Sequence, residues 1–443
     1  MYLIGATGSG KSEVMKNLIW GQIRQDNSAV VLLDPKGDLA REVSRFTDHL
    51  PARRREKLVY ISPFDFDGQT PVINPLQLPP HEPHEYETLV SLTTMEVERA
   101  LDNIFNEMMS GFTGAMKSVL SPCIETLIRK GDADFWDLLR FMDDKLNADL
   151  VELGKASPNH AVRMFFTYSF NEIANETKKG IEWRCRNLLK SQGFAGLTSG
   201  KTTVHLKQLI NKKCCIIFNL DRGLMGTQVS SQFGKLVISL IQVIAMQRGG
   251  LPPERKTPIY MYIDEFHNCA TEAVKEILAE ARSNKLFLTL AQTLVAQGIS
   301  EKDFKHVLLG NTNIKIMGKS ALGNCKDMEA EFNTPVEQLL RLPSFYYYIK
   351  IGNGKAFRIK GRGGLVKDKN AMQQREWSQL SAEQLRKYYV PVDKAIEERS
   401  KQEAERTSRR PQAASGKRAA KTPMQKKEKD RTDTPDENIA YPI

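Results

Sequence analysis

The chain has 443 residues and a hydrophobic fraction of 41%, which is ordinary for a globular protein and long enough for two or three domains. Its formal net charge of +11 at pH 7 favours a polyanionic partner, either nucleic acid or an anionic membrane surface. A basic tail on a neutral body would give the same total. The longest apolar stretch, residues 236–246, is interrupted by Ser239 and Gln242 and is shorter than a membrane span, so it predicts a short core helix.

Strands and helices alternate in the first 84 residues, as they do in α/β proteins. The run at 29–34 is continuously apolar and ends in an acid, which is typical of a buried parallel strand. Residues 71–80 are rich in proline and predict an irregular connection. Strands are expected at 1–4, 29–34 and 57–61, with an amphipathic helix at 11–25.

Helical periodicity replaces the strand pattern between residues 85 and 200. The breakers Gly111, Gly131, Pro158 and Gly193 separate the periodic segments. We therefore predict an all-α domain inserted into the α/β unit. Its helices are expected at 86–108, 114–129, 135–145, 162–175 and 177–190.

The α/β pattern returns over residues 201–394, and Gly-Asn-Gly at 352–354 predicts a hairpin. Beyond it, residues 395–443 nearly lack aromatic and branched apolar side chains, so they predict a disordered basic tail. The basic pairs of this tail would suit DNA or acidic lipids, and a solvated tail with no partner explains them equally well. Strands are expected at 214–219, 259–263, 286–291, 313–317, 345–351 and 356–359, and helices at 228–248 and 272–283.

Six cysteines are spread along the chain, and no two of them form a C-x-x-C pair. Such spacing carries no zinc or disulfide signature. Reduced thiols are the ordinary state of cysteine in the cytosol. We therefore predict a cytosolic protein with six free thiols and no cysteine metal site.

An octapeptide of the form G-x-x-x-x-G-K-S follows the first strand and opens the first helix. Its glycines let backbone N–H groups approach phosphate oxygens, its lysine reaches the β and γ phosphates, and its serine hydroxyl binds Mg²⁺. The positive end of the following helix points at the phosphates. The motif predicts a site for ATP and Mg²⁺, rather than a purely structural loop, at Gly5, Ala6, Thr7, Gly8, Ser9, Gly10, Lys11 and Ser12.

Asp264 and Glu265 follow the apolar run 259–263. An acid at the end of a buried strand can hold a magnesium ion through water, and a neighbouring glutamate can orient and deprotonate the attacking water. Two acids here are also compatible with the region before a helix at 272. The octapeptide at 5–12 is a phosphate-binding loop (P-loop). Because the same chain contains this P-loop, we assign Asp264 to the metal and Glu265 to the role of catalytic base.

Two polar residues flank the strand expected at 286–291. In such folds this strand commonly lies between the P-loop strand and the strand ending at Asp264, so Gln292 at its tip can touch the γ-phosphate or the attacking water. Arg282, which precedes the strand, would suit a finger that reaches a neighbouring subunit's nucleotide. The alternatives are a surface glutamine and an arginine placed favourably at a helix C-terminus.

The segment 34–38, Asp-Pro-Lys-Gly-Asp, follows the second strand. Its side chains therefore emerge at the same edge of the sheet as the P-loop. The segment either lines the nucleotide site or forms a turn.

Taken in order, these segments resemble the conjugative coupling proteins of type IV secretion systems, the TraG/TraD family within the HerA–FtsK group of motor ATPases. The resemblance extends from residue 1 to about residue 360. The P-loop alone would be unspecific, whereas the ordered series with a helical insertion is considerably more specific. The matching stretches are 5–12, 34–38, 73–76, 263–266, 281–286 and 290–293.

The resemblance implies an α/β fold, namely a RecA-like P-loop NTPase domain with a mainly parallel sheet, plus an inserted all-α domain, and the composition adds the disordered tail. The RecA-like domain would comprise residues 1–84 and 201–394, and the insertion residues 85–200. Carried over to this sequence, Lys11 and Ser12 bind phosphate and Mg²⁺, Asp264 serves the metal and Glu265 is the base. Gln292 would sense the γ-phosphate, and Arg282 would act as a finger in trans.

The same resemblance implies an ATPase of the DNA translocase type. It would form a homo-hexameric ring around a channel that passes single-stranded DNA, and would hand a relaxase–DNA complex to a secretion channel. Coupling proteins of this family usually carry transmembrane helices ahead of the motor, whereas here the P-loop strand begins at residue 1. We expect a missing upstream segment, or a partner, to hold the protein at the cytoplasmic face of the inner membrane.

Two other functions stay open at this point. A related ATPase that assembles the secretion apparatus and handles protein would share the motor residues. A receptor that docks cargo proteins and uses nucleotide only to hold its shape would also contain a P-loop, although intact catalytic acids favour turnover.

Overall fold

The computed structural model describes residues 1–392, apart from residues 67, 109–110, 270–273, 276, 279–280, 296–301 and 365–369. The predicted tail, and part of the helix predicted at 272–283, lie outside these described residues. Residues 1–397 pack as one unit, so the domain boundaries proposed near residues 84 and 200 stay predictions.

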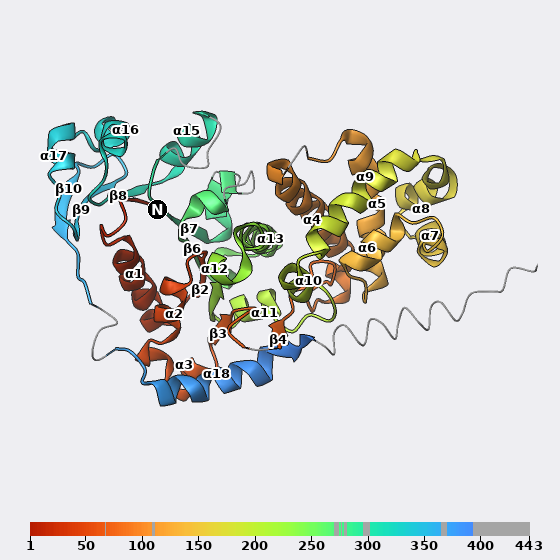
Figure 1. The fold of residues 1–443 in the computed structure, drawn as a ribbon, viewed down its shortest axis with the longest axis horizontal. Helices are drawn as coiled ribbons and strands as arrows, with labels where there is room; N and C mark the ends of the chain where they lie inside the picture. Colours follow the sequence, from red (N-terminus) through yellow and green to blue (C-terminus); the bar gives the residue numbers. More distant parts are fainter. Residues whose placement is uncertain are drawn as a thin grey trace, which may run out of the picture. The chain divides into compact units, whose positions relative to one another are not determined.

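Within the described residues, nine strands form one sheet in the order β10-β9-β8-β1-β7-β6-β2-β5-β3 (Figure 1). The neighbours from β8 to β3 pair in parallel, whereas β8, β9 and β10 pair antiparallel and include the predicted hairpin. The two remaining strands, β4 and β11, pair with each other. The strands are β1 Tyr2–Ile4, β2 Ala29–Asp34, β3 Leu58–Ile61, β4 Gln69–Pro71, β5 Cys215–Asn219, β6 Ile259–Ile263, β7 Leu286–Gln292, β8 Ile314–Met317, β9 Tyr346–Ile351, β10 Phe357–Lys360 and β11 Tyr389–Pro391.

The predicted neighbourhood of β7 is confirmed, because β7 lies between β1 and β6. Ile4 is level with Gln292, and Ile263 is level with Leu290. The carboxyl ends of β1, β7, β6 and β2 therefore meet at one edge of the sheet, where ligands bind in open parallel sheets.

Helices cover both faces of the sheet, and alternate residues of β2 show the two faces. Val31 and Leu33 belong to the core on one side, and Val30 and Leu32 to the core on the other. Two helices, α1 and α2, pack on the second face, and α13 packs on the first. The helices of this α/β part are α1 Lys11–Gln25, α2 Asp38–Ser44, α3 Ala52–Arg55, α11 Leu206–Asn211, α12 Arg222–Met225, α13 Thr227–Met246, α15 Lys302–Asn311, α16 Leu322–Phe332, α17 Val336–Leu340 and α18 Gln374–Tyr388.

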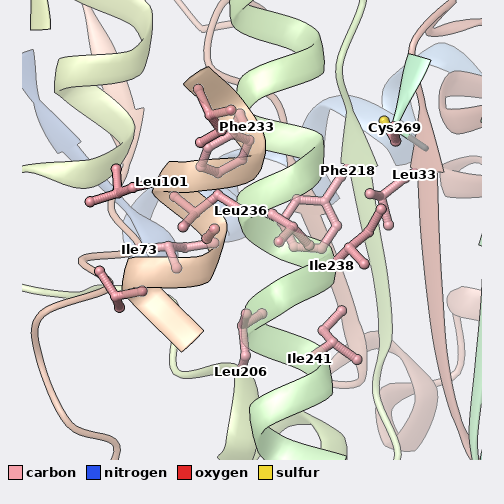
Figure 2. Close-up of a cluster of buried hydrophobic side chains, with 14 of the residues drawn as sticks. Leu33, Ile73, Leu101, Leu206, Phe218, Phe233, Leu236, Ile238, Ile241 and Cys269 are labelled. Atoms are coloured by element: carbon pink, nitrogen blue, oxygen red, sulfur yellow. The ribbon is translucent and has the colours of Figure 1, made fainter. Parts of the chain in front are cut away.

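Helix α13 joins the sheet to the helical segment. Figure 2 shows it between Leu101 of α4 on one side and Leu33 and Phe218 of the strands on the other. It agrees closely with the helix predicted at 228–248, and the apolar stretch 236–246 lies within it. Among the described residues, α13 is the one helix that is long and apolar enough to cross a membrane. However, 83% of its apolar 18-residue stretch is buried inside the structure. Burial on that scale is what a core helix shows.

Among the described residues of 86–198 the regular elements are all helices, joined by short turns. The prediction of one helix over 162–175 is wrong, because α8 ends at Met164 and a π-helix and a 3-10 turn follow. Ring contacts among Phe141, Phe166 and Phe170 explain the change, because the wider turn lets both later rings pack on Phe141. The helices here are α4 Tyr86–Met108, α5 Gly114–Lys130, α6 Phe135–Phe141, α7 Ala148–Lys155, α8 His160–Met164, α9 Asn175–Leu189 and α10 Gln192–Thr198.

All six cysteines are free and buried. Burial raises the pKa of the Cys185 thiol to about 12, and the pKa values of Cys123 and Cys215 shift in the same direction for the same reason. They therefore contribute apolar volume to the core rather than a reactive thiolate.

Side chains from the end of the described chain cover the edge strand β3. The buried amide of Gln384 in α18 accepts from the backbone N–H of Tyr60 (3.0 Å) and donates to the carbonyl of Leu58 (3.0 Å). The Tyr389 hydroxyl accepts from the N–H of Ser62 and donates to the carbonyl of Tyr60. These bonds replace a further strand and leave the edge without the open ladder groups that template aggregation.

Replacing Gln384 with leucine should destabilise the fold, because two buried backbone groups of β3 would lose their partner. Each such group costs about 1–3 kcal/mol, so we expect a loss of roughly 2–4 kcal/mol in the urea unfolding free energy. Gln379→Leu, on an exposed position of the same helix, is the matched control and should shift it by less than about 0.5 kcal/mol. Equal midpoints for the two variants would contradict this account of the sheet edge.

Candidate phosphate-binding site

The P-loop follows β1, and two backbone hydrogen bonds hold it to segments that flank β8 and β9, on the side of β1 opposite β7. The N–H of Ala6 donates to the carbonyl of Lys319 (2.7 Å), and the carbonyl of Ser9 accepts from the N–H of Phe345 (3.1 Å). Gly10 has φ 97°, and a Cβ there would lie 2.2 Å from the Tyr347 hydroxyl oxygen. Only glycine fits at this position, because the backbone is left-handed and the neighbouring strand leaves no room.

Lys11 is the first residue of α1, and its side chain turns back over the loop. Its ammonium donates to the carbonyl of Gly5 (2.6 Å) and of Ala6 (3.3 Å). Burial lowers the pKa of Lys11, and the charges of Glu265 and Asp264 oppose that shift. β1 and β6 lie on either side of β7 in the parallel sheet, so the P-loop lysine and the two acids emerge at the same edge. Ser12 lies exposed in the same first turn.

Asp264 lies at the carboxyl end of β6 and is almost completely buried. Its N–H donates to the carbonyl of Leu33 in β2, and its carboxylate accepts from the N–H of Glu265 (3.0 Å). Burial, with the negative charges of Asp34 and Glu265, raises the pKa of Asp264 to about 7. A cation beside this group would favour its ionised form.

Glu265 has φ 43°, an uncommon left-handed conformation for a glutamate. Its carboxylate contacts the ammonium of Lys36, and it accepts from the Thr293 hydroxyl (3.3 Å). His267 Nδ1 lies 3.4 Å from its second oxygen. Burial alone would raise the pKa of Glu265, but the hydrogen bond and charge of Lys36, with Lys11 and His267, outweigh it and lower the pKa.

The turn after β2 places Lys36 against Glu265. Asp34 accepts from the N–H of Lys36 (2.9 Å) and of Ala40 (2.9 Å) through its two carboxylate oxygens. Gly37 has φ 80° and completes the turn. The segment 34–38 is therefore a turn, and one of its side chains also borders the site.

Gln292 is fully buried at the tip of β7. Its amide nitrogen donates to the Tyr2 hydroxyl (2.6 Å) and to the carbonyl of Val295 (3.1 Å). Its Oε1 is buried, with no hydrogen-bond partner in the described part of the chain. An acceptor in this position has a fixed orientation and a vacant bonding capacity, as a sensor of a bound water would need.

The structure brings together Lys11, Asp264 and Glu265, and it places Gln292 on the strand between them. Arg282 lies in the 3-10 turn Ala281–Asn284, and its side chain is outside the described residues. The sequence indicated that the segment 34–38 either lines the site or forms a turn, but it predicted no contact of Glu265 with Lys36 or Thr293. Both follow strands that end at this edge, and that position is the signal that marks them.

The donor set fits a nucleoside triphosphate with Mg²⁺. Gly8 has φ 76°, and a Cβ at this residue would meet no heavy atom within 4 Å, so its backbone is open to a phosphate. A lysine and the first turn of a 15-residue helix supply positive charge beside it. Magnesium prefers oxygen ligands and is commonly held by one or two carboxylates or hydroxyls together with substrate phosphates, as Asp264 and Ser12 would allow.

This fold and site define a RecA-like P-loop NTPase. The family model of the helicase HerA central domain matches residues 1–239, more than half of the chain. The chain therefore belongs to the HerA family, and the predicted membership of the HerA–FtsK group is confirmed.

Solved structures of the plasmid coupling protein TrwB and of VirB4 share this fold. The plasmid coupling protein TrwB with the non-hydrolysable analogue ADPNP has a TM-score of 0.59 at 14% identity, over 84% of this chain and 86% of that one. TrwB with ADP and Mg²⁺ has a TM-score of 0.59 at 14% identity, over 85% and 87%. VirB4 of Thermoanaerobacter pseudethanolicus has a TM-score of 0.55 at 15% identity, over 83% and 90%. No curated protein matches the chain.

Replacing Lys36 with methionine should lower the rate of ATP hydrolysis, because the buried Glu265 carboxylate would lose the partner that fixes its position. We expect kcat to fall by roughly 10-fold or more, with little change in KM, as for a group that acts in the transition state. Lys36→Arg should retain most of the rate. Lys57→Met, which breaks an ion pair with Asp26 away from the site, is the control. An unchanged kcat in Lys36→Met would show that the contact is incidental.

Proposed function

We propose that this protein is an ATP-hydrolysing motor that pumps single-stranded DNA and couples a relaxase–DNA complex to a type IV secretion channel. The observation that carries the proposal is the meeting of Lys11, Asp264 and Glu265 at one sheet edge in a chain of the HerA family. A site with a phosphate-binding lysine, a carboxylate for the metal and a second carboxylate for water has the parts needed for turnover.

In this proposal the residues act on the phosphates, on the metal's ligands and on the attacking water. Bound Mg²⁺ would neutralise charge on the β and γ phosphates. Lys11 leaves its two carbonyl acceptors to donate to phosphate oxygens, and Ser12 and Asp264 orient the metal's ligands. Glu265 orients the attacking water, and Gln292 offers its unpaired Oε1 to the same water. Arg282 would act in trans, which requires a ring.

The DNA part of the proposal rests on two supports. The chain carries a net charge of +11, and a basic channel can track phosphates without reading bases. The similar structure TrwB is described as a plasmid coupling protein. A homo-hexamer, contact with a relaxase and channel proteins, and a place at the cytoplasmic face of the inner membrane complete the proposal.

A second candidate is an ATPase that acts on protein within the secretion apparatus. The fold similarity to VirB4 favours it almost equally, because the TM-score of 0.55 is close to the 0.59 of TrwB. The two candidates share every motor residue, so only the substrate separates them.

ATP hydrolysis by the purified protein should rise severalfold on addition of single-stranded DNA, because a translocase couples turnover to its track. The stimulation should fall steeply with salt, since DNA binding releases counterions. Glu265→Gln should still bind ATP but lose about 10²–10⁴-fold in rate, the usual contribution of a positioned general base. Lys11→Ala should weaken ATP binding itself.

The outcomes separate the candidates. Basal turnover that requires Glu265 but ignores DNA, together with no salt-sensitive DNA binding, would reject the DNA pump and favour the protein-handling ATPase. Equal function of wild type and Glu265→Gln in a transfer assay would reject both, and would favour a receptor that uses nucleotide only to hold its shape.

A further inference from the structure

Phe345 is a half-exposed aromatic residue directly beside the P-loop. It precedes β9 and has φ 64°, a strained conformation for a bulky side chain. Its N–H donates to the carbonyl of Ser9 (3.1 Å), and its carbonyl accepts from the N–H of Gly361 (2.7 Å). Both backbone groups are thus paired, so the backbone from which the ring projects is fixed beside the P-loop.

The ring lies against glycines. A Cβ on Gly10 would lie 2.8 Å from Cδ1 of Phe345, and one on Gly363 would lie 3.9 Å from its Cε1. Yet the side chain stays 43% exposed. Its neighbour Tyr347 shows the contrast, because that ring is 1% exposed and its hydroxyl anchors the carbonyl of Ser9. Tyr347 therefore accounts for the stability of the loop, and Phe345 adds an open aromatic surface that packing does not require.

The order of strands shows which end of a bound nucleotide would lie there. Asp264 and Glu265 follow β6, on the β7 side of the P-loop strand, and they define the end at which the terminal phosphate reacts. On the opposite side of β1 lie β8 and β9. A triphosphate that runs from Glu265 across the P-loop therefore carries its nucleoside toward β9, where Phe345 lies.

We propose that the ring of Phe345 stacks on the base of the bound nucleotide, a proposal that rests on the nucleotide-binding function proposed above. An aromatic face recognises the π-surface that every base has, and it does not read the hydrogen-bonding edge. Phe345 therefore contributes binding to purine nucleotides alike, and the P-loop alone binds the phosphates.

The test compares three ligands by calorimetry in the presence of Mg²⁺: ATP, GTP and inorganic tripolyphosphate, which has no base. Phe345→Ala should raise the Kd of ATP and of GTP by roughly 10-fold each, as expected for the loss of one base–aromatic stack. The Kd of tripolyphosphate should not change. Phe345→Trp should bind both nucleotides at least as well as wild type.

Two further variants make the result decisive. Phe345→Gly removes the ring while tolerating the left-handed backbone, so it should behave as Phe345→Ala does. Phe357→Ala removes an aromatic ring of similar exposure, 47%, from β10 of the same hairpin, and it should leave all three Kd values unchanged.

The proposal would be overturned if Phe345→Ala and Phe345→Gly both bound ATP and GTP with unchanged Kd. This holds also if the two variants changed only the oligomeric state. An equal loss of tripolyphosphate and ATP would also overturn it, because Phe345 would then only support the P-loop. Failure of the proposed nucleotide-binding function would give a different result. Wild type would then bind none of the three ligands, or would bind them as tightly as Lys11→Ala does.

Discussion

The parallel pairing of β1 between β7 and β8 is the constraint on which the site depends. The strand has only three residues, Tyr2–Ile4, and all are fully buried. At its end the N–H of Gly5 donates to the carbonyl of Gln292, and the N–H of Ala6 donates to the carbonyl of Lys319. The P-loop therefore starts from a position fixed by both neighbours. A slip of one residue would turn Tyr2 and Ile4 to the opposite face, so the core itself holds the register.

Segments from late in the chain complete what the first twelve residues begin. Gln384 and Tyr389 satisfy the outer edge of β3, and Phe345 and Tyr347 fix the carbonyl of Ser9 at the other side of the sheet. A long parallel sheet needs such support because its edges expose unpaired backbone groups. The hairpin of β9 and β10 thus has two roles, as an antiparallel border of the sheet and as a wall of the P-loop.

Sequence alone predicted the parts of the site that lie in continuous motifs. The P-loop and the acids after β6 follow from short patterns. The place of β7 beside β1 was predicted from the strand order that is common in such folds. The contact between Lys36 and Glu265 joins residues 229 positions apart, and no local pattern encodes such a pairing. The helical prediction over 162–175 failed for a related reason, because the mutual packing of Phe141, Phe166 and Phe170 replaced regular helical geometry with a π-helix.

The electrostatic environment gives the two neighbouring acids different characters. Burial and nearby negative charge raise the pKa of Asp264 to about 7, whereas Lys36 and Lys11 lower the pKa of Glu265 despite its burial. Groups whose environments separate their pKa values in this way commonly have separate tasks. Around Asp264 the negative charges outweigh the positive charge of Lys36, and a divalent cation would reverse that balance. Glu265 has the positive charges of Lys36 and Lys11 beside it, and these favour its ionised form. In the proposed reaction the Glu265 carboxylate orients the attacking water and accepts its proton. Lys36 and Thr293 set the direction in which this carboxylate points.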